Sequence, residues 1–324
     1  MSLEKRPTLR AYLELVRPPA LFTSAADSLT GCVWASSLIG GASYPASGLS
    51  FTGLAFSCLL ISVCVYAAGM CTNDLFDHEE DLRDRPQRPL PSGRISRVAA
   101  WRFALLLQLL ALASSALIPH LLSLELRAGH PWLWFEVTLF TIGATYLYNG
   151  PLKNTLIAPV IMGLCRFGNF WIGGITVYAM SNATPDLHTG IAFSAGTALY
   201  VTLLTVLSRF EVSGGRDGRI AAGLLCLSSL TPLLWWLNGW MSLGACAALL
   251  LAVWLSSKMW TVLSGRDTGP SQIQRSMGSG IRGVALLNVV LCLGLGGMSG
   301  YLTACLLLLL AWSAGRIGRW FYAT

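Results

Sequence analysis

The chain of 324 residues contains 54% hydrophobic residues and only 11% charged ones. A soluble domain carries about 25% charged residues, so this chain has too little charge to cover a surface that faces water. The composition excludes soluble globular, disordered and fibrous proteins and indicates a surface that contacts lipid. The formal net charge of +7 arises from 22 Lys and Arg against 15 Asp and Glu. The distribution of the basic residues along the chain, described below, explains this charge without a nucleic-acid partner.

The first nineteen residues are polar and basic, and they lack the short apolar run and the cleavage site of a signal peptide. We therefore expect the first apolar run to stay in the membrane. A helix needs about 20 mostly apolar residues to cross the hydrocarbon core. Ten segments meet this requirement, near residues 20–39, 51–72, 98–119, 132–148, 156–179, 190–207, 221–238, 240–262, 281–298 and 300–315. The last two segments meet around residues 296–300. The alternative is therefore that these two segments form one broken span, so that the chain has nine spans.

The basic residues predict how these spans are oriented, because Lys and Arg accumulate in cytoplasmic loops. With a cytoplasmic N-terminus, 20 of the 22 basic residues lie on the inside; Arg127 lies outside, and Arg166 lies within the fifth span. Ten spans also place Arg316 and Arg319 inside, whereas nine would place them outside. We therefore expect a multi-pass protein of the cell (inner) membrane with both termini cytoplasmic. Its transmembrane domain covers residues 20–315, between cytoplasmic segments at residues 1–19 and 316–324.

The loop after the second span is the most acidic part of the chain, since residues 73–84 contain six of the fifteen acids. If the second span continues as a helix, Asp74, Asp77 and Asp81 lie at i, i+3 and i+7 and share one face. Three carboxylates on one face repel each other unless cations lie between them. Mg²⁺ prefers oxygen ligands and completes its coordination with substrate phosphates. The spacing therefore predicts a Mg²⁺ site; a solvated acidic loop is the alternative.

A stretch rich in arginine and proline, residues 85–94, follows the acids directly. Its three prolines restrict the backbone and so fix the directions in which its arginines project. Guanidinium groups bind phosphate oxygens in a bidentate manner. Acids for a metal followed by arginines for phosphate predict a diphosphate site at the cytoplasmic end of the second span. Anchoring by positive charge on the inside is the alternative role of these arginines.

The pattern Asn-Asp-x-x-Asp-x-x-x-Asp followed by Arg-Pro-Leu-Pro-Ser-Gly, here Asn73 to Asp81 and then Arg88 to Gly93, resembles the first signature of the UbiA superfamily of intramembrane prenyltransferases. Tyr148 to Lys153 is similar to that family's Tyr-x-x-Pro-Leu-Lys stretch, whose lysine helps to hold diphosphate. The resemblance covers about nine-tenths of the chain. It implies an all-α, polytopic membrane helix bundle with nine to ten transmembrane helices around a lipid-accessible cavity. It also implies Mg²⁺-diphosphate at the cytoplasmic mouth and an isoprenoid tail within the membrane.

The second signature of that family, an Asp-x-x-x-Asp pair after the sixth span, is altered here. Near residue 211 the chain has a single acid, Glu211, and the next acid is Asp217, beyond a Gly-Gly turn. Either Glu211 alone serves a second metal position, or Arg209 and Arg216 neutralise diphosphate in its place, or prenyl transfer has been lost. The Ser-Arg-x-Glu stretch, the Cys-Arg-x-x-Asn stretch at 165–169 and the tenth span resemble the divergent branch encoded in bacterial Ebo-type clusters.

Asp27 in the first predicted span and Arg166 in the fifth are ionisable residues inside the membrane. Such residues cost several kcal/mol in a membrane unless they face a polar cavity or a partner. One interpretation is that Arg166 and Asn169, which share a helix face, line the cavity near the polar head of a substrate. The other is that Arg166 pairs with a neighbouring helix, for which Asp27 is one candidate partner.

Together these patterns predict an integral membrane prenyltransferase that moves an isoprenyl group from a prenyl diphosphate donor to a lipophilic acceptor in the lipid bilayer. The expected catalytic residues are Asp74, Asp77, Asp81, Arg88, Lys153 and Glu211. The expected ligands of Mg²⁺ are Asp74, Asp77, Asp81 and Glu211, and the expected substrate-binding residues are Asn73, Arg88, Lys153, Arg166, Asn169 and Arg209. The competing class is a non-catalytic relative that binds or carries a lipid diphosphate, or a transporter subunit. Transporters commonly show internal repeats, and this chain shows none.

Overall fold

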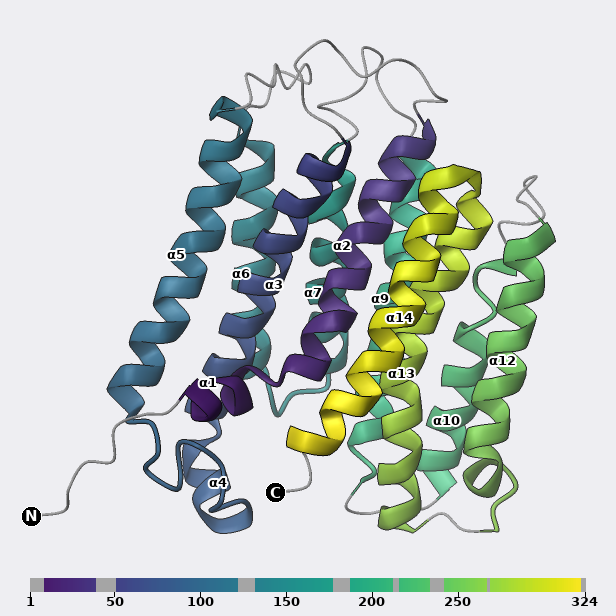
Figure 1. Ribbon diagram of the computed structural model, residues 1–324. Coiled ribbons are helices and arrows are strands. Elements are labelled where there is room, and N and C mark those ends of the chain that lie inside the picture. Colours follow the sequence, from purple (N-terminus) through teal and green to yellow (C-terminus); the bar gives the residue numbers. More distant parts are fainter. Residues whose placement is uncertain are drawn as a thin grey trace, which may run out of the picture.

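The computed structural model describes residues 9–38, 51–121, 132–176, 187–211, 216–233, 242–266 and 269–321. These residues form helices and turns and contain no strand. Ten helices follow the ten expected spans in order: α2 (Pro18–Leu38), α3 (Phe51–Phe76), α5 (Arg97–Leu121), α6 (Leu133–Asn149), α7 (Ala158–Gly174), α9 (His188–Ser208), α10 (Arg216–Ser228), α12 (Ser242–Leu263), α13 (Pro270–Leu295) and α14 (Gly297–Phe321). Two short helices, α1 (Leu9–Val16) and α4 (His78–Asp84), lie at one end of the bundle (Figure 1). The fold is therefore the predicted all-α bundle.

The outer surface of the bundle is apolar, as a surface in lipid requires. Large hydrophobic side chains are exposed along the outer helices, including Leu106 on α5, Leu250 and Val253 on α12, and Leu302 and Leu309 on α14. Within the described residues, five helical segments are long and apolar enough to cross a membrane: Gly53–Phe76, Arg97–Leu117, His188–Ser208, Leu243–Leu263 and Pro270–Leu295. Exposed apolar belts of this extent are not found on soluble monomers. The protein is a multi-pass membrane protein.

The second helix, α2, occupies the middle of the bundle. It packs against α3 and α7 on one side and against α13 and α14 on the other. In Figure 1 the N-terminal helices α3, α5 and α6 stand on one side of α2, while α10 and α12 lie on the opposite side, beyond α13. The helices that precede and follow the acidic stretch, α3 and α5, pack against each other and against α6. The acidic stretch is therefore held at the end of a tightly packed group of helices.

The last two helices are separate, so the alternative of one broken segment is wrong. Gly296 and Gly297 have φ values of 69° and 71°, a left-handed conformation that glycine adopts without steric cost. The chain reverses there, and α14 packs back against α13 and α2. Helix α1 and the C-terminal end of α14 lie at the same end of the bundle (Figure 1), as an even number of crossings requires. Helix α14 continues to Phe321, beyond the expected boundary at residue 315, and Arg316 packs its guanidinium group over the Trp312 ring at 4.3 Å.

A close contact between α2 and α7 sets the position of the polar groups inside the bundle. A Cβ atom on Gly173 would lie 1.8 Å from the carbonyl oxygen of Ser28, and one on Gly31 would lie 2.1 Å from that of Phe170. Small residues let membrane helices approach backbone to backbone. Because Asp27 and Arg166 precede these contacts on their helices, the same approach brings their side chains together.

Candidate functional site

The acidic stretch forms an almost continuous helix. The backbone N–H of Asp77 donates to the carbonyl of Asn73 at 2.9 Å, and that of Asp81 donates to the carbonyl of Asp77 at 2.8 Å. Helical hydrogen bonding therefore crosses the junction of α3 and α4. The side chains of Asp74 and Asp81 are buried, with exposed fractions of 3% and 1%. Burial of carboxylates at the end of an apolar helix requires cationic partners.

Arginines supply the partners of the two buried acids. Arg88 Nη1 lies 2.7 Å from a carboxylate oxygen of Asp81 and 3.6 Å from one of Asp74. Arg17, at the junction of α1 and α2, also forms an ion pair with Asp74, and Arg85 lies 3.3 Å from Asp81. One guanidinium nitrogen thus lies between the two carboxylates, so the loop that follows α4 is folded back onto the helix end.

The third acid, Asp77, is tied to another part of the chain. Lys153, from the loop between α6 and α7, forms an ion pair with one of its carboxylate oxygens. The Asn73 side chain donates to the other oxygen at 3.0 Å. The structure therefore brings together the expected residues of the first motif and the lysine of the Tyr-x-x-Pro-Leu-Lys stretch. We call this charged cluster the mouth; it consists of Arg17, Asn73, Asp74, Asp77, Asp81, Arg85, Arg88 and Lys153.

The mouth has the chemical groups for a divalent cation. Among the described residues no three acidic, histidine or cysteine side chains converge on one point as metal ligands do; Asp74, Asp77 and Asp81 each bind Arg or Lys instead. The donors are carboxylate oxygens, which suit Mg²⁺. Arg88 already places positive charge between Asp74 and Asp81. The residues present therefore fit a cation at this position.

The altered second motif lies beside the mouth. Arg209 donates a hydrogen bond to the carbonyl of Thr155, two residues after Lys153, and so connects the end of α9 to the loop between α6 and α7. Glu211 forms no ion pair with the described side chains. Partial burial raises the pKa of the Glu211 carboxyl, and the nearby Arg85 guanidinium opposes that rise. Arg85 thus interacts electrostatically with Glu211 and forms an ion pair with Asp81.

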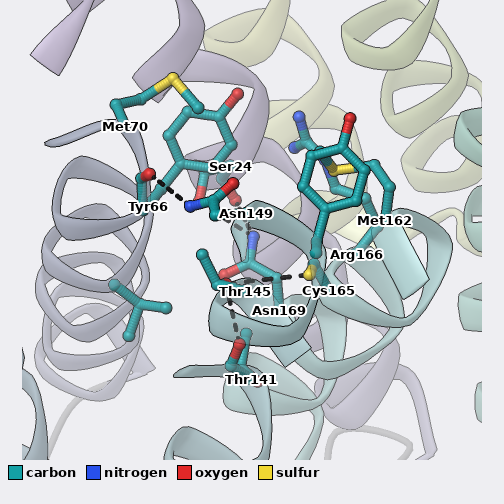
Figure 2. Close-up of a pocket in the computed structure, with 13 residues that line it drawn as sticks. Ser24, Tyr66, Met70, Thr141, Thr145, Asn149, Met162, Cys165, Arg166 and Asn169 are labelled. Carbon is teal, nitrogen blue, oxygen red and sulfur yellow. Dashed lines mark hydrogen bonds between the residues drawn. The ribbon is translucent and has the colours of Figure 1, made fainter. Parts of the chain in front are cut away.

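A small pocket of about 50 Å³ lies among α2, α3, α6 and α7 (Figure 2). Tyr148, in its wall, interacts electrostatically with both Asp77 and Arg209, so the pocket adjoins the mouth. The lining residues are Ser24, Val65, Tyr66, Gly69, Met70, Thr141, Thr145, Tyr148, Asn149, Met162, Cys165, Arg166 and Asn169. Both residues expected to line a cavity, Arg166 and Asn169, are among them.

Arg166 is bound to the neighbouring helix as well as lining the pocket. Its Nη1 lies 2.9 Å from Asp27 Oδ2, and its Nη2 donates to the Thr23 hydroxyl at 2.9 Å. Its guanidinium carbon stands 5.1 Å from the ring centre of Tyr66, within the range of a cation–π interaction. The two interpretations of this residue are thus combined, because the ion pair itself forms part of the pocket wall.

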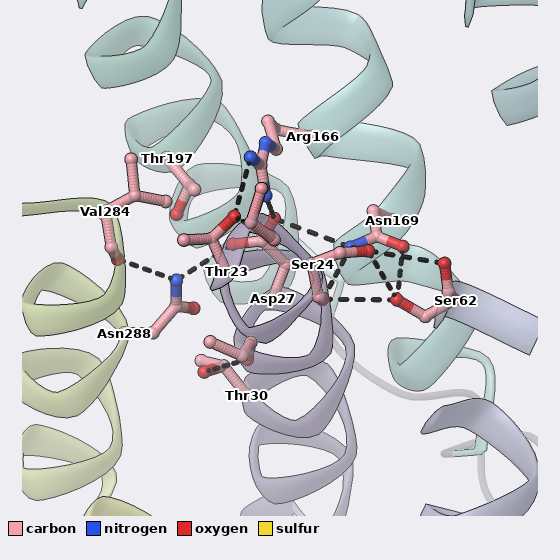
Figure 3. Close-up of polar contacts among 12 residues, drawn as sticks. Thr23, Ser24, Asp27, Thr30, Ser62, Arg166, Asn169, Thr197, Val284 and Asn288 are labelled. Atoms are coloured by element: carbon pink, nitrogen blue, oxygen red, sulfur yellow. Dashed lines mark hydrogen bonds and ion pairs between the residues drawn. The ribbon is translucent and has the colours of Figure 1, made fainter. Parts of the chain in front are cut away.

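Other polar side chains extend this ion pair into a network that joins four helices, α2, α3, α7 and α13 (Figure 3). Asn169 donates to the carbonyl of Ser24 at 2.7 Å and accepts a hydrogen bond from the Ser62 hydroxyl at 2.7 Å. On the far side, Asn288 of α13 donates to Asp27 Oδ1 at 2.8 Å. The network joins the N-terminal helices to the C-terminal half of the bundle.

Sequence reasoning missed Arg17, Tyr66 and Asn288. The Arg-Pro-Pro stretch at residues 17–19 marks the start of a helix, and nothing in its spacing points to an acid 57 positions later. A single basic residue directly before the first span was the available signal. Tyr66 and Asn288 lie in apolar segments where a polar side chain is the only indication of a role.

The apolar helix bundle, with its charged mouth next to an internal pocket, defines an integral membrane protein. Residues 33–279 match the model of the UbiA prenyltransferase family. The match covers most of the chain, and the chain belongs to this family.

Known relatives agree with this membership. A digeranylgeranylglyceryl phosphate synthase of Sulfolobus acidocaldarius is 32% identical over 172 residues, 52% of this chain and 53% of the relative. A synthase with the same description from Methanothermobacter thermautotrophicus is 31% identical over 214 residues, 61% of this chain and 71% of the relative. The chain therefore spans about half the length of the first relative.

Solved structures share the fold. A structure described as a digeranylgeranylglyceryl phosphate synthase in membranes has a TM-score of 0.60 at 18% identity, over 89% of this chain and 98% of that one. A UbiA homolog from Archaeoglobus fulgidus, bound to DMAPP and Mg²⁺, has a TM-score of 0.57 at 18% identity, over 86% of this chain and 98% of that one. At this level of identity the likeness shows the fold.

Proposed function

We propose that this protein is a Mg²⁺-dependent prenyltransferase that moves an isoprenyl group from a prenyl diphosphate to a lipophilic acceptor within the membrane. The observation that carries the proposal is the arrangement of the mouth, in which Asp74, Asp77 and Asp81 are paired with Arg and Lys next to the pocket. Family membership supports the reaction type. The presence of DMAPP and Mg²⁺ in a homolog of the same fold supports the donor class and the metal.

In this proposal the charges of the mouth are redistributed when the donor binds. Asp74, Asp77 and Asp81, aided by Glu211, would hold Mg²⁺, which when bound withdraws charge from the leaving diphosphate. Arg17, Arg88 and Lys153, which pair with the acids in the structure, would then neutralise phosphate oxygens. The same side chains would thus keep the net charge of the mouth small once Mg²⁺ and diphosphate are bound, which limits the cost of burying charge.

The pocket receives the reacting end of the donor. The bond between the allylic carbon and the diphosphate oxygen breaks, and its electron pair leaves with the diphosphate, whose charge the mouth stabilises as it develops. A carbon or oxygen nucleophile of the acceptor then bonds to the allylic cation and loses a proton. The walls from α3, α6 and α7 exclude water, which would otherwise capture the cation. Arg166 and Asn169 contact the polar head of the acceptor.

The protein is proposed to lie in the cell membrane with both termini and the mouth on the cytoplasmic side. The supporting observation is that α1, α4 and the C-terminal end of α14 lie at one end of the bundle (Figure 1), and that the acids of the mouth are in α3 and α4. Residues 20–315 constitute the transmembrane domain in this proposal, with residues 1–19 and 316–324 at its cytoplasmic ends.

The test is to incubate purified protein in lipid nanodiscs with Mg²⁺, a panel of prenyl diphosphates and a lipid extract. Diphosphate release is measured, and products are identified by mass spectrometry. Mg²⁺-dependent release together with a prenylated lipid is the expected result. Donor binding without release would identify a lipid-diphosphate carrier instead, and the absence of binding would contradict both functions.

A further inference from the structure

We infer that the pocket binds an uncharged acceptor that carries hydroxyl groups, and that Asp27 is the residue that sets this preference. The inference rests on the proposed function, because it concerns the second substrate of the same site. The mouth takes the anionic group of the donor, while the pocket takes a polar but neutral head. The relatives are named for a product that contains phosphate, so this preference would distinguish the present chain.

The first observation is that the pocket has no net charge. Arg166 is the single ionisable cation among its lining residues, and its guanidinium group is already bound to Asp27 at 2.9 Å. The side chain of Asp27 is fully buried, and that of Arg166 is 9% exposed. An anionic head in the pocket would therefore have to compete with a carboxylate that is in place, or remain as an additional buried charge. Such a charge without its own partner is strongly unfavourable.

The second observation is that neither member of the ion pair is free to turn away. Both oxygens of Asp27 are used: Oδ1 accepts from Asn288 at 2.8 Å, and Oδ2 binds Arg166. The second guanidinium nitrogen of Arg166 donates to Thr23. The contact of α2 with α7 at Gly173 holds the two helices at this distance. Releasing Arg166 for an anion would break several buried hydrogen bonds at once.

The third observation is that the pocket offers neutral hydrogen-bonding groups. The hydroxyls of Tyr66 and Tyr148 line it, and neither forms a hydrogen bond with the residues that the structure describes. Asn149 uses its Nδ2 to donate to Gly69 and Thr72, and its Oδ1 has no donor in the described part of the chain. A phenol hydroxyl can both donate and accept. These groups suit alcohol or ether oxygens, which need hydrogen bonds but no countercharge.

The test compares two acceptors that differ by one phosphate: a radiolabelled prenylglycerol ether and its phosphate monoester. Equilibrium binding is measured in nanodiscs of uncharged lipid, with Mg²⁺ and inorganic diphosphate present to fill the mouth. We expect the ether to bind at least about tenfold more tightly than its phosphate ester. Equal or tighter binding of the phosphate ester, or no binding of either compound, would overturn the inference.

Asp27→Asn removes the countercharge without changing the volume of the side chain. It should reverse the preference in favour of the phosphate ester, because Arg166 is then uncompensated. Asp217→Asn, the same change at an exposed position on α10, should leave the ratio of the wild-type protein unchanged. An Asp27→Asn protein that folds and keeps the wild-type ratio would contradict the role of Asp27. If this variant does not fold, the wild-type ratio still decides the acceptor class.

Diphosphate release in the same samples separates this inference from the proposed function. A protein that binds the ether preferentially but never releases diphosphate from a prenyl diphosphate supports the inference about the pocket and contradicts catalysis. A protein that releases diphosphate but transfers the isoprenyl group to the phosphate ester supports catalysis and contradicts the inference.

Discussion

Lys153 forms an ion pair with Asp77, although the two residues lie 76 positions apart in the chain. The pair joins the junction of α3 and α4 to the loop between α6 and α7. Its side chains are 28% and 10% exposed, so the pair is more accessible than Asp74 and Asp81. A ligand that enters the mouth from the aqueous side therefore meets this pair before the two buried carboxylates.

Substitution of Asp77 by Ala should reduce Mg²⁺-dependent donor binding by at least about 100-fold, because one carboxylate of the metal site and the partner of Lys153 are lost together. The protein should remain folded, since this side chain is at the edge of the bundle. Calorimetric titration with a prenyl diphosphate in detergent measures the affinity. Asp84→Ala, at an exposed position of α4, is the matched control and should bind normally. Normal donor affinity in a folded Asp77→Ala protein would contradict the assignment of the diphosphate site to the mouth.

Arg166→Met should lower the free energy of unfolding by about 3–5 kcal/mol, because it leaves the carboxylate of Asp27 buried without its cation. Adding Asp27→Leu should recover much of this loss, since no buried charge then remains. Thermal unfolding in detergent measures both effects. The control is Arg10→Met in the exposed pair of Arg10 with Glu14, for which the loss should be about 1 kcal/mol or less. A single and a double variant of equal stability would show that the ion pair is not coupled.

The sequence predicted which residues form this site better than it predicted which of their side chains pair with one another. The spacing of Asp74, Asp77 and Asp81 placed them on one helix face, because helical periodicity is local and can be read from the chain. Their pairing with Arg17 and Lys153 depends on how three helix ends meet in space, which the local pattern does not contain. The sequence therefore predicted a cation between the carboxylates, while the structure shows these carboxylates paired with Arg17, Arg88 and Lys153.

The helix boundaries also include some that the sequence predicted and one that it did not. Long apolar runs such as that of α5 predicted the span to within two residues at each end, because the thickness of the membrane fixes the length. The start of α13 at Pro270, well before the expected position near 281, was not predicted. Its first turns alternate buried apolar residues, such as Ile273 and Met277, with exposed polar ones, such as Gln274 and Arg275, and a search for continuous apolar runs does not detect a helix of this mixed composition.

Gly173→Ala should destabilise the protein by about 1–3 kcal/mol, since the added Cβ would overlap the carbonyl of Ser28 and force α2 away from α7. The distance between Asp27 and Arg166 should increase with it. Gly143→Ala in α6 is the matched control, because a Cβ there meets no atom within 4 Å and alanine favours the helix by up to about 1 kcal/mol. Unfolding midpoints in detergent compare the two. Equal midpoints would mean that the helices adjust without cost.

Both termini should be found on the cytoplasmic side. The 20 basic residues assigned to the inside, against Arg127 alone on the outside, favour this orientation. Reporters that are active on only one side of the membrane, fused separately to each end, measure it. An N-terminal and a C-terminal fusion active on the far side would reverse the proposed orientation, and activity on opposite sides would contradict ten crossings.

The last prediction concerns the altered second motif. If Glu211 serves a second metal position, Glu211→Gln keeps the shape of the side chain but removes its charge, so donor binding should need about tenfold more Mg²⁺. Turnover should fall more than affinity, because the lost interaction acts mainly on the leaving diphosphate. Arg209→Ala should instead weaken donor binding at every Mg²⁺ concentration, since a guanidinium group contacts phosphate directly.

The opposite pattern would indicate that Arg209 and Arg216 neutralise the diphosphate in place of a second metal ion. In that case Glu211→Gln has almost no effect, and Arg209→Ala is severe at all Mg²⁺ concentrations. Because Arg209 also donates to the carbonyl of Thr155, Arg209→Lys is the control that keeps the charge and loses the planar fork. Titrations of donor binding and turnover against Mg²⁺ distinguish the two patterns. If neither Glu211→Gln nor Arg209→Ala changes binding or turnover, the end of α9 is not part of the site, and the acids of α3 and α4 act without it.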